Sequence, residues 1–188
     1  VGVSPSRVHT CAVLSSGVVK CWGDGQSGNL GDGVSRSLYQ PSLTPVTVSG
    51  ITTATQLASG SETTCALLQD TTVKCWGRGD QGTRGDGSTA NSALSPVAVA
   101  GLTGVSQIVG GRLHMCAVMI DQSLRCWGSN YYGELGDGTR TRKTTSQAVT
   151  LPGPVATADG GATGTCAALT SGAVYCWGGN SDGQLGIG

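Results

Sequence analysis

Residues 11–23 read CAVLSSGVVKCWG, and the same pattern returns three more times along the chain. Each copy ends in a Cys-Trp-Gly triplet, and a second cysteine lies ten residues before the cysteine of that triplet. The triplets begin at Cys21, Cys75, Cys126 and Cys176, at steps of 54, 51 and 50 residues. Because this pattern accounts for all eight cysteines and all four tryptophans, the sequence predicts one repeat array over residues 1–188.

Each copy of the pattern predicts a tight β-hairpin. Folding residues 11–21 about Ser16 places Cys11 opposite Cys21, and Gly17 tolerates the positive φ that hairpin turns use. Further extended stretches precede the hairpin at 56–58 and 107–109 and follow it at 45–48 and 96–99. No window has the helical spacing of apolar residues, so we expect an all-β protein with four short strands per unit.

Four-stranded units of about fifty residues cannot bury both faces of their sheet alone, which favours a β-propeller-like array of four-stranded blades. The cysteine spacing divides the chain into units 3–56, 57–107, 108–157 and a truncated 158–188. The chain thus supplies about 3.5 to 4 blades, and the last sheet is expected to be one strand short. Other copies or further repeats would complete this partial array, because an unpaired sheet edge recruits other strands.

The repeat resembles that of the regulator of chromosome condensation family. The resemblance rests on CAVLSSGVVKCWG and on the tail GNLGDG at residues 28–33, with related tails at 82–87, 133–138 and 183–188. It covers all four units and implies a β-propeller, typically of seven blades. It also implies a protein partner, since family members bind a small GTPase, chromatin or, in a bacterial branch, β-lactamases. The regular cysteines suggest the bacterial, disulfide-containing branch.

The cysteine pairs predict one disulfide in each hairpin, because cysteines opposite one another on antiparallel strands are close enough to bridge. The predicted bridges are Cys11–Cys21, Cys65–Cys75, Cys116–Cys126 and Cys166–Cys176. Reduced, packed cysteines and metal ligation are the alternatives, although zinc sites use closer Cys-x-x-Cys spacing. Persistent disulfides need an oxidising compartment, so we expect a secreted protein, extracellular or at the cell surface.

Composition and charge further restrict the classes of partner that we expect. Gly makes up 32 of 188 residues, and eleven Lys plus Arg balance eleven Asp plus Glu. Such a chain has no basic stripe to neutralise nucleic-acid phosphates, and none of its apolar runs approaches the roughly 20 residues of a membrane span. We therefore expect neither a nucleic-acid partner nor a membrane span.

Several short motifs mimic functional sites, and we interpret each as part of the repeat. Residues 23–28 and 77–82 match the dinucleotide fingerprint GxGxxG, but no helix pattern follows them. We interpret the middle position of this stretch as a turn with positive φ; it is occupied by Gly25, Gly79, Asn130 and Asn180. The RGD triplets at 78–80 and 84–86 resemble integrin ligands but align with ordinary turn and tail residues of other units.

The recurring tail aspartates suggest calcium, whereas a lone Asp between glycines more often bonds its own turn backbone. They are Asp32, Asp86 and Asp137. His9 and His114 have no nucleophile or carboxylate at a catalytic spacing, so we interpret them as structural and expect no enzyme, no cofactor and no metal.

The aromatic residues divide into two groups. One tryptophan per unit is expected to pack between units, with a ligand-stacking platform as the alternative: Trp22, Trp76, Trp127 and Trp177. Candidate binding-surface aromatics are Tyr39, Tyr131 and Tyr132.

The sequence thus favours a non-enzymatic extracellular scaffold that presents a surface to an unidentified protein. One alternative is a structural subunit of a homopolymeric filament or surface layer, in which copies join through their incomplete terminal units. Another is a proteinaceous inhibitor of a secreted enzyme, which would gather the three tyrosines on one rim.

Overall fold

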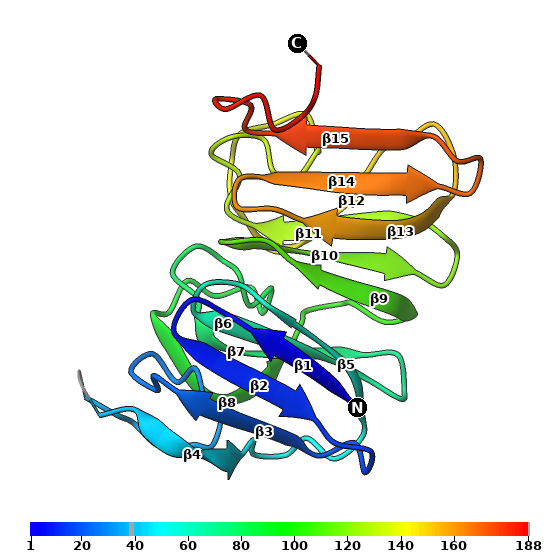
Figure 1. Cartoon of the computed structure of the whole chain (residues 1–188). Coiled ribbons are helices and arrows are strands. Elements are labelled where there is room, and N and C mark those ends of the chain that lie inside the picture. The colour runs from blue at the N-terminus through cyan, green and yellow to red at the C-terminus, as the bar shows by residue number, and fades with distance from the viewer. Residues whose placement is uncertain (38–39, 188) are drawn as a thin grey trace.

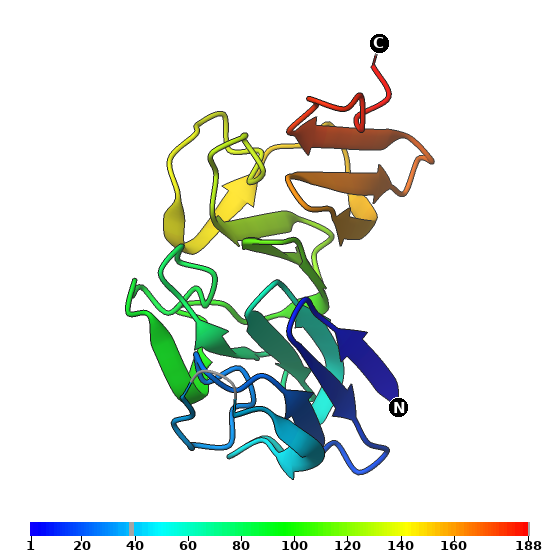
Figure 2. The same cartoon turned by 60° about the vertical axis from the view of Figure 1, so that its left-hand side comes forward.

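The computed structural model describes residues 1–37 and 40–187, which form four small antiparallel β-sheets arranged in an arc (Figure 1). In every sheet the strand order follows the chain, so each sheet is a meander. Figure 2 shows the sheets following one another along the arc from the N-terminal to the C-terminal end. Over the described ranges no helix is long and apolar enough to cross a membrane. The prediction of an all-β, propeller-like array is confirmed.

We call the sheets blades 1 to 4. Blade 1 contains β1 (Gly2–Pro5), β2 (His9–Val13), β3 (Val19–Gly23) and β4 (Ser42–Thr47). Blade 2 contains β5 (Ala54–Ser59), β6 (Thr63–Leu68), β7 (Val73–Arg78) and β8 (Ser92–Ala98). Blade 3 contains β9 (Val105–Gly110), β10 (His114–Met119), β11 (Leu124–Gly128) and β12 (Lys143–Val149). Blade 4 contains β13 (Val155–Gly160), β14 (Gly164–Leu169) and β15 (Val174–Gly178), and no fourth strand within the described residues.

The second and third strands of each blade form the predicted hairpin. Cys11 lies opposite Cys21 in the register, and the turn is closed by a hydrogen bond from Leu14 N–H to Val18 O of 2.9 Å. The equivalent hairpins of the other blades pair in the same register. All eight cysteines therefore form the four predicted disulfides, Cys11–Cys21, Cys65–Cys75, Cys116–Cys126 and Cys166–Cys176.

Consecutive blades are joined by the tryptophan of the later blade. Its indole N–H donates to a main-chain carbonyl in the Gly-rich tail of the preceding blade. The three bonds are Trp76 Nε1 to Asn29 O (3.0 Å), Trp127 Nε1 to Thr83 O (2.9 Å) and Trp177 Nε1 to Glu134 O (2.9 Å). Trp76 and Trp127 are fully buried, whereas Trp22 and Trp177 are partly buried.

A glycine of each tail makes room for that indole. A Cβ added to Gly31 would lie 2.8 Å from Trp76, and one added to Gly136 would lie 2.7 Å from Trp177. Both glycines also have positive φ, +64° and +65°, which residues with side chains rarely adopt. Backbone conformation and close approach therefore require glycine at this position for separate reasons.

Two buried histidines add polar contacts between blades. His9 Nε2 lies 2.7 Å from Thr64 Oγ1 of blade 2, and His114 Nε2 lies 2.9 Å from Thr165 Oγ1 of blade 4. Burial lowers the pKa of each imidazole from 6.5 to about 4, and Asp24 partly offsets this shift at His9. Both histidines are therefore neutral in the folded protein at pH 7.

The interpretation of one glycine position as a positive-φ turn is wrong. Gly25, Gly79, Asn130 and Asn180 are not among the residues with positive φ. A Cβ on Gly25 would lie 2.6 Å from Cδ of Arg36, and one on Gly79 would overlap the Arg84 guanidinium. Glycine is present in blades 1 and 2 because an arginine fills the space above it.

In blades 3 and 4, asparagine occupies the position that glycine has in blades 1 and 2. Asn130 Oδ1 accepts a hydrogen bond from Leu135 N–H of 3.0 Å, and Asn180 Oδ1 accepts one from Leu185 N–H of 2.9 Å. The asparagine side chain thus bonds the tail directly.

Four strands per unit were expected, but the sequence located the outer strand only in blades 1 and 2. β12 lacks the Pro-Val-x-Val sequence that marks β4 and β8. The strand nevertheless pairs with β11 in the same way, with Arg125 opposite Ala148 and Cys126 opposite Gln147. Pairing with an existing hairpin is enough to form the strand without the local signal.

We expect Trp76→Ala to lower the free energy of unfolding by about 3–5 kcal/mol, because it removes a fully buried indole and leaves a cavity between blades 1 and 2. Urea unfolding followed by circular dichroism would measure the change. An unchanged midpoint would contradict a core role for this tryptophan.

A pair of glycine variants separates close packing from backbone strain. Gly31→Ala and Gly87→Ala both force alanine into positive φ, but a Cβ at Gly87 meets nothing within 4 Å. We expect Gly31→Ala to destabilise by about 1–3 kcal/mol more than Gly87→Ala, since only its Cβ collides with Trp76. Equal losses would show that the indole does not need this approach.

Acid should destabilise the fold between about pH 6.5 and pH 4. Over this range the histidines bind protons in the unfolded chain but not in the folded one, so unfolding becomes easier as the pH falls. Each histidine contributes up to about 3 kcal/mol of this loss at pH 4. Urea unfolding at several pH values would measure it.

The control for this pH dependence comes from blade 2, which carries Thr63 at the histidine position. The double variant His9→Thr, His114→Thr should show a much flatter profile between pH 6.5 and 5. The same slope in both proteins would assign the acid sensitivity to other groups.

Candidate functional site

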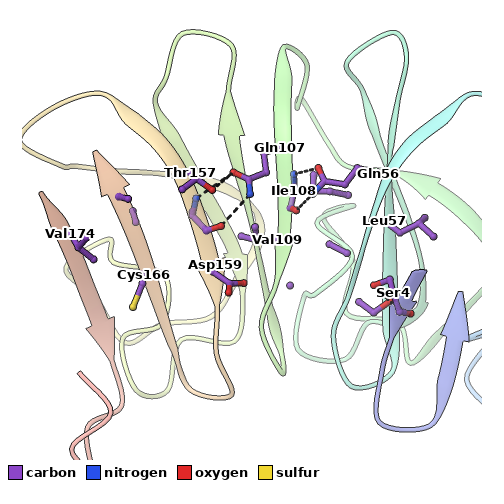
Figure 3. A pocket seen from close by; sticks show the side chains of 16 residues that line it. Ser4, Gln56, Leu57, Gln107, Ile108, Val109, Thr157, Asp159, Cys166 and Val174 are labelled. Carbon is purple, nitrogen blue, oxygen red and sulfur yellow. Dashed lines mark hydrogen bonds between the residues drawn. The ribbon is translucent and has the colours of Figure 1, made fainter. Parts of the chain in front are cut away.

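The first strands of the blades, β1, β5, β9 and β13, lie side by side, and together with residues of β14 and β15 they line a groove of 630 Å³ (Figure 3). Its polar lining side chains are Ser4, Gln56, Ser59, Gln107, Thr157 and Asp159, and the remaining lining residues are apolar. The first strand of each blade borders the groove, as the first strands border the central channel of a propeller.

Glutamine side chains connect the walls of this groove. Gln56 Nε2 donates to Ile108 O (2.9 Å), and Ile108 N–H donates back to Gln56 Oε1 (3.0 Å). Gln107 makes the same pair of bonds with Ala158 of β13, each 3.3 Å long. Each glutamine amide therefore hydrogen-bonds the main chain of the next blade as a neighbouring strand would. Its N–H and its oxygen are both used in these bonds, as the dashed lines in Figure 3 show.

Sequence reasoning missed these two glutamines. Their only signal is that both precede an apolar residue at the same repeat position, 51 residues apart. Their side chains hold the strands of the groove together, and their amide groups are not free to bind a ligand.

The more varied surface is one end of the blades, which we call the loop rim. It consists of the turns between first and second strands, at residues 6–8, 60–62, 111–113 and 161–163, and of the loops that follow the third strands. Arg7 and Arg112 occupy equivalent positions in two of these turns, and both are exposed.

An ion-pair cluster lies between these two arginines on the rim. Arg78 Nη1 is 3.3 Å from Glu62 Oε1, and Arg78 Nε is 2.8 Å from Asp80 Oδ1. Burial opposes ionisation of Asp80, but hydrogen bonds from Arg78 and Gln81 outweigh it and lower the pKa of this carboxyl. The arginine and aspartate of this RGD triplet therefore bind each other.

The second RGD triplet is also committed to the fold. Arg84 is buried, its Nε lies 3.1 Å from Asp86 Oδ2, and its Nη1 donates to Ala90 O (2.8 Å). Neither triplet presents a free arginine and a free aspartate together.

The three tail aspartates bond their own turns, as the turn interpretation predicts. Their Oδ1 atoms accept main-chain N–H bonds two residues on, in the pairs Asp32 with Val34, Asp86 with Ser88 and Asp137 with Thr139. In the described part of the chain, no three His, Cys, Asp or Glu side chains lie together where they could hold a metal ion.

Two of the candidate tyrosines lie together on the loop rim. Tyr131 and Tyr132 follow β11, their ring centroids are 4.9 Å apart, and the rings meet edge to face at 82°. Tyr131 is 73% and Tyr132 47% exposed. Ser129 N–H donates to Leu113 O (2.8 Å), which places this loop beside the turn that carries Arg112. The remaining candidate, Tyr39, lies outside the described residues.

The Glu134 side chain accepts hydrogen bonds from the loop that carries the two tyrosines. This buried carboxylate accepts the main-chain N–H of Tyr132 at Oε2 (2.8 Å) and the hydroxyl of Ser129 at Oε1 (3.4 Å). The loop backbone is thus held in place while both rings remain in solvent. Such an arrangement can contact a partner's surface without first having to fold.

Comparison with known proteins supports the family resemblance. Models of the regulator of chromosome condensation (RCC1) repeat match residues 16–67, 54–83, 105–134 and 157–184. The ultraviolet-B receptor UVR8 of Arabidopsis thaliana is 35% identical over 156 residues, which are 81% of this chain and 35% of the receptor. Human E3 ubiquitin-protein ligase HERC2 is 34% identical over 142 residues, 73% of this chain and 3% of the ligase.

Solved structures share this fold. Yeast RCC1 (Prp20), crystallised bound to Kap60, superposes with a TM-score of 0.86 at 22% identity over 100% of this chain and 45% of that chain. Human WBSCR16 gives a TM-score of 0.82 at 26% identity over 94% of this chain and 46% of that chain. The chain therefore spans about a third of UVR8 and less than half of these two structures. Its repeats place it in the regulator of chromosome condensation (RCC1) repeat family.

Proposed function

We propose that this chain is a non-enzymatic, protein-binding scaffold that works outside the cytosol and presents its loop rim to the partner. The observation that carries the proposal is the disulfide in every blade, with all eight cysteines paired. Reducing compartments do not maintain such bridges, so four of them in one array indicate secretion.

The loop rim is the surface best suited to a protein partner. Exposed tyrosine and arginine side chains are typical of the residues that dominate protein interfaces. Here Tyr131, Tyr132 and Arg112 lie on adjacent loops, and disulfide-closed hairpins hold those loops rigidly. Binding to such a surface costs little conformational entropy.

Thiol trapping tests the compartment. The protein would be collected with N-ethylmaleimide from culture medium and from cell lysate of the cells that produce it, then digested without reductant. We expect the bridged peptides and no alkylated cysteine in the medium fraction. Intracellular protein with free thiols throughout would overturn the extracellular proposal.

Tyrosine variants test the binding surface. Biotinylated chain would be crosslinked to the proteins secreted by the same cells, and the captured set compared by quantitative mass spectrometry. We expect Tyr131→Ser, Tyr132→Ser to lower capture of a specific partner at least tenfold, and Tyr175→Ser on β15 to leave it unchanged. Capture that is identical for all three proteins would exclude the tyrosine pair.

The same experiment examines the narrower proposal of an inhibitor. A captured secreted enzyme should lose activity in proportion to added chain, and the double tyrosine variant should not inhibit it. Full activity at saturating chain would leave a scaffold rather than an inhibitor.

A further inference from the structure

We propose that the loop rim binds an acidic side chain of its protein partner in a hollow between Arg7 and Arg112. This hollow, which we call the arginine hollow, has a volume of 270 Å³ and is lined by residues of the first-strand turns of all four blades. The inference rests on the proposed function and names the chemistry of the partner, an exposed segment that carries aspartate or glutamate.

The arginine hollow carries charge of one sign. Arg7 and Arg112 are the only charged residues in its lining within the described ranges. The rest of the lining consists of Ser59, Ser61, Ala162 and glycines. The hollow therefore holds two positive charges and no carboxylate that would cancel them.

The repeat places the two arginines on either side of a smaller residue. Arg7 and Arg112 stand at the same repeat position in blades 1 and 3, and Ser61 occupies this position in blade 2, which lies between them. Ser61 N–H donates to Arg112 O (2.9 Å), which holds the turns of blades 2 and 3 against each other. Because serine is short, it leaves the space that a third arginine would fill.

Glycines let the turns approach one another closely beside the two arginines. A Cβ added to Gly60 would lie 3.0 Å from Arg112 O, and one added to Gly160 would lie 2.7 Å from Gly111 N. The main chain around the hollow is therefore closely packed before any partner arrives. Binding does not have to order it, which lowers the entropic cost of association.

Neither arginine of the hollow is neutralised by the chain itself. Over residues 1–37 and 40–187 neither guanidinium forms an ion pair, and both side chains are exposed. Glu62 and Asp80 line an adjoining hollow of 160 Å³, which both arginines also border, but these two carboxylates pair with Arg78. The positive charge of the arginine hollow is thus available to a ligand.

A carboxylate is the group that matches these donors. A guanidinium binds a carboxylate through two parallel N–H···O bonds, and such charge-assisted bonds are stronger than neutral ones. Two guanidinium groups that border one hollow repel each other, and a carboxylate between them replaces this repulsion by two attractions. The Ser61 hydroxyl adds a further donor at the same place.

The neighbouring tyrosines favour a protein segment as the source of this carboxylate. Tyr131 and Tyr132 follow β11, and Ser129 N–H donates to Leu113 O (2.8 Å), so their loop lies beside the turn that carries Arg112. A protein segment can place an acidic residue in the hollow and an apolar residue on the exposed rings. A nucleic acid would instead meet a chain whose net charge is zero.

Fluorescence anisotropy of a labelled oligoglutamate peptide at low ionic strength tests the hollow directly. We expect the double variant Arg7→Gln, Arg112→Gln to bind the peptide at least about tenfold more weakly, because it removes both guanidinium donors. The control Lys74→Gln, Arg140→Gln removes the same charge outside the hollow and should change the affinity less than about twofold. Equal binding by all three proteins, or no binding to the unaltered chain, would overturn the inference.

Substitution of Ser61 supplies the ligand from the chain itself. Ser61→Glu places a carboxylate between the two arginines, so it should weaken peptide binding at least about tenfold relative to Ser61→Gln, which adds the same volume without charge. At low salt Ser61→Glu should also unfold at higher urea than Ser61→Gln. Far-ultraviolet circular dichroism would show that each variant is folded. Equal peptide affinities for the two variants would show that this hollow does not hold a carboxylate.

Partner capture separates this inference from the proposed function. In the crosslinking experiment with secreted proteins, we expect Arg7→Gln, Arg112→Gln to lower capture of the partner, and oligoglutamate to compete with the unaltered chain. A partner that is lost with the tyrosine variant but kept with the arginine variant would overturn this inference alone. An oligonucleotide of equal charge that competes better than oligoglutamate would replace the acidic segment by nucleic acid. No captured partner at all would overturn the proposed function, while peptide binding is measured separately.

Discussion

The structure depends on one contact, an indole lying against a glycine of the preceding blade. A tryptophan buries more apolar area than any other residue that the repeat could use here, but its N–H needs an acceptor. The tail supplies a main-chain carbonyl, and its glycine removes the Cβ that would keep the ring away, as at Gly31 and Trp76. This contact therefore buries the indole, gives its N–H an acceptor and lets the ring approach the main chain closely. The sheets can then stack as blades.

Other contacts vary from junction to junction around that constant one. A His–Thr bond is present between blades 1 and 2 and between blades 3 and 4, whereas glutamine amides link blades 2, 3 and 4 along the groove. Thr63 and Met115 replace the histidine and threonine between blades 2 and 3. Among the side-chain hydrogen bonds between blades, the indole bond alone is common to the three junctions, which explains why a repeat array tolerates change at the other side chains.

Local features of the fold could be predicted from the sequence, and contacts between blades only in part. The hairpins and disulfides follow from ten-residue cysteine spacing within one turn, so no distant residue is needed to infer them. Gln56 gave no comparable signal, because its partners are the main-chain atoms of Ile108, which any residue would provide. Gly79 was misread because glycine serves both unusual φ and close packing, and only the position of Arg84 distinguishes them.

The four repeats also separate residues that build the fold from residues free to serve binding. Cysteine and tryptophan stand at the same position in every blade, while the first-strand turns carry Arg7, Ser61, Arg112 and Ala162 at one equivalent position. A position that differs in every neighbouring blade is not required for stacking. Residues of the loop rim can therefore differ between blades without disturbing the junctions. A partner that binds Tyr131 and Tyr132 would recognise one blade rather than the repeat.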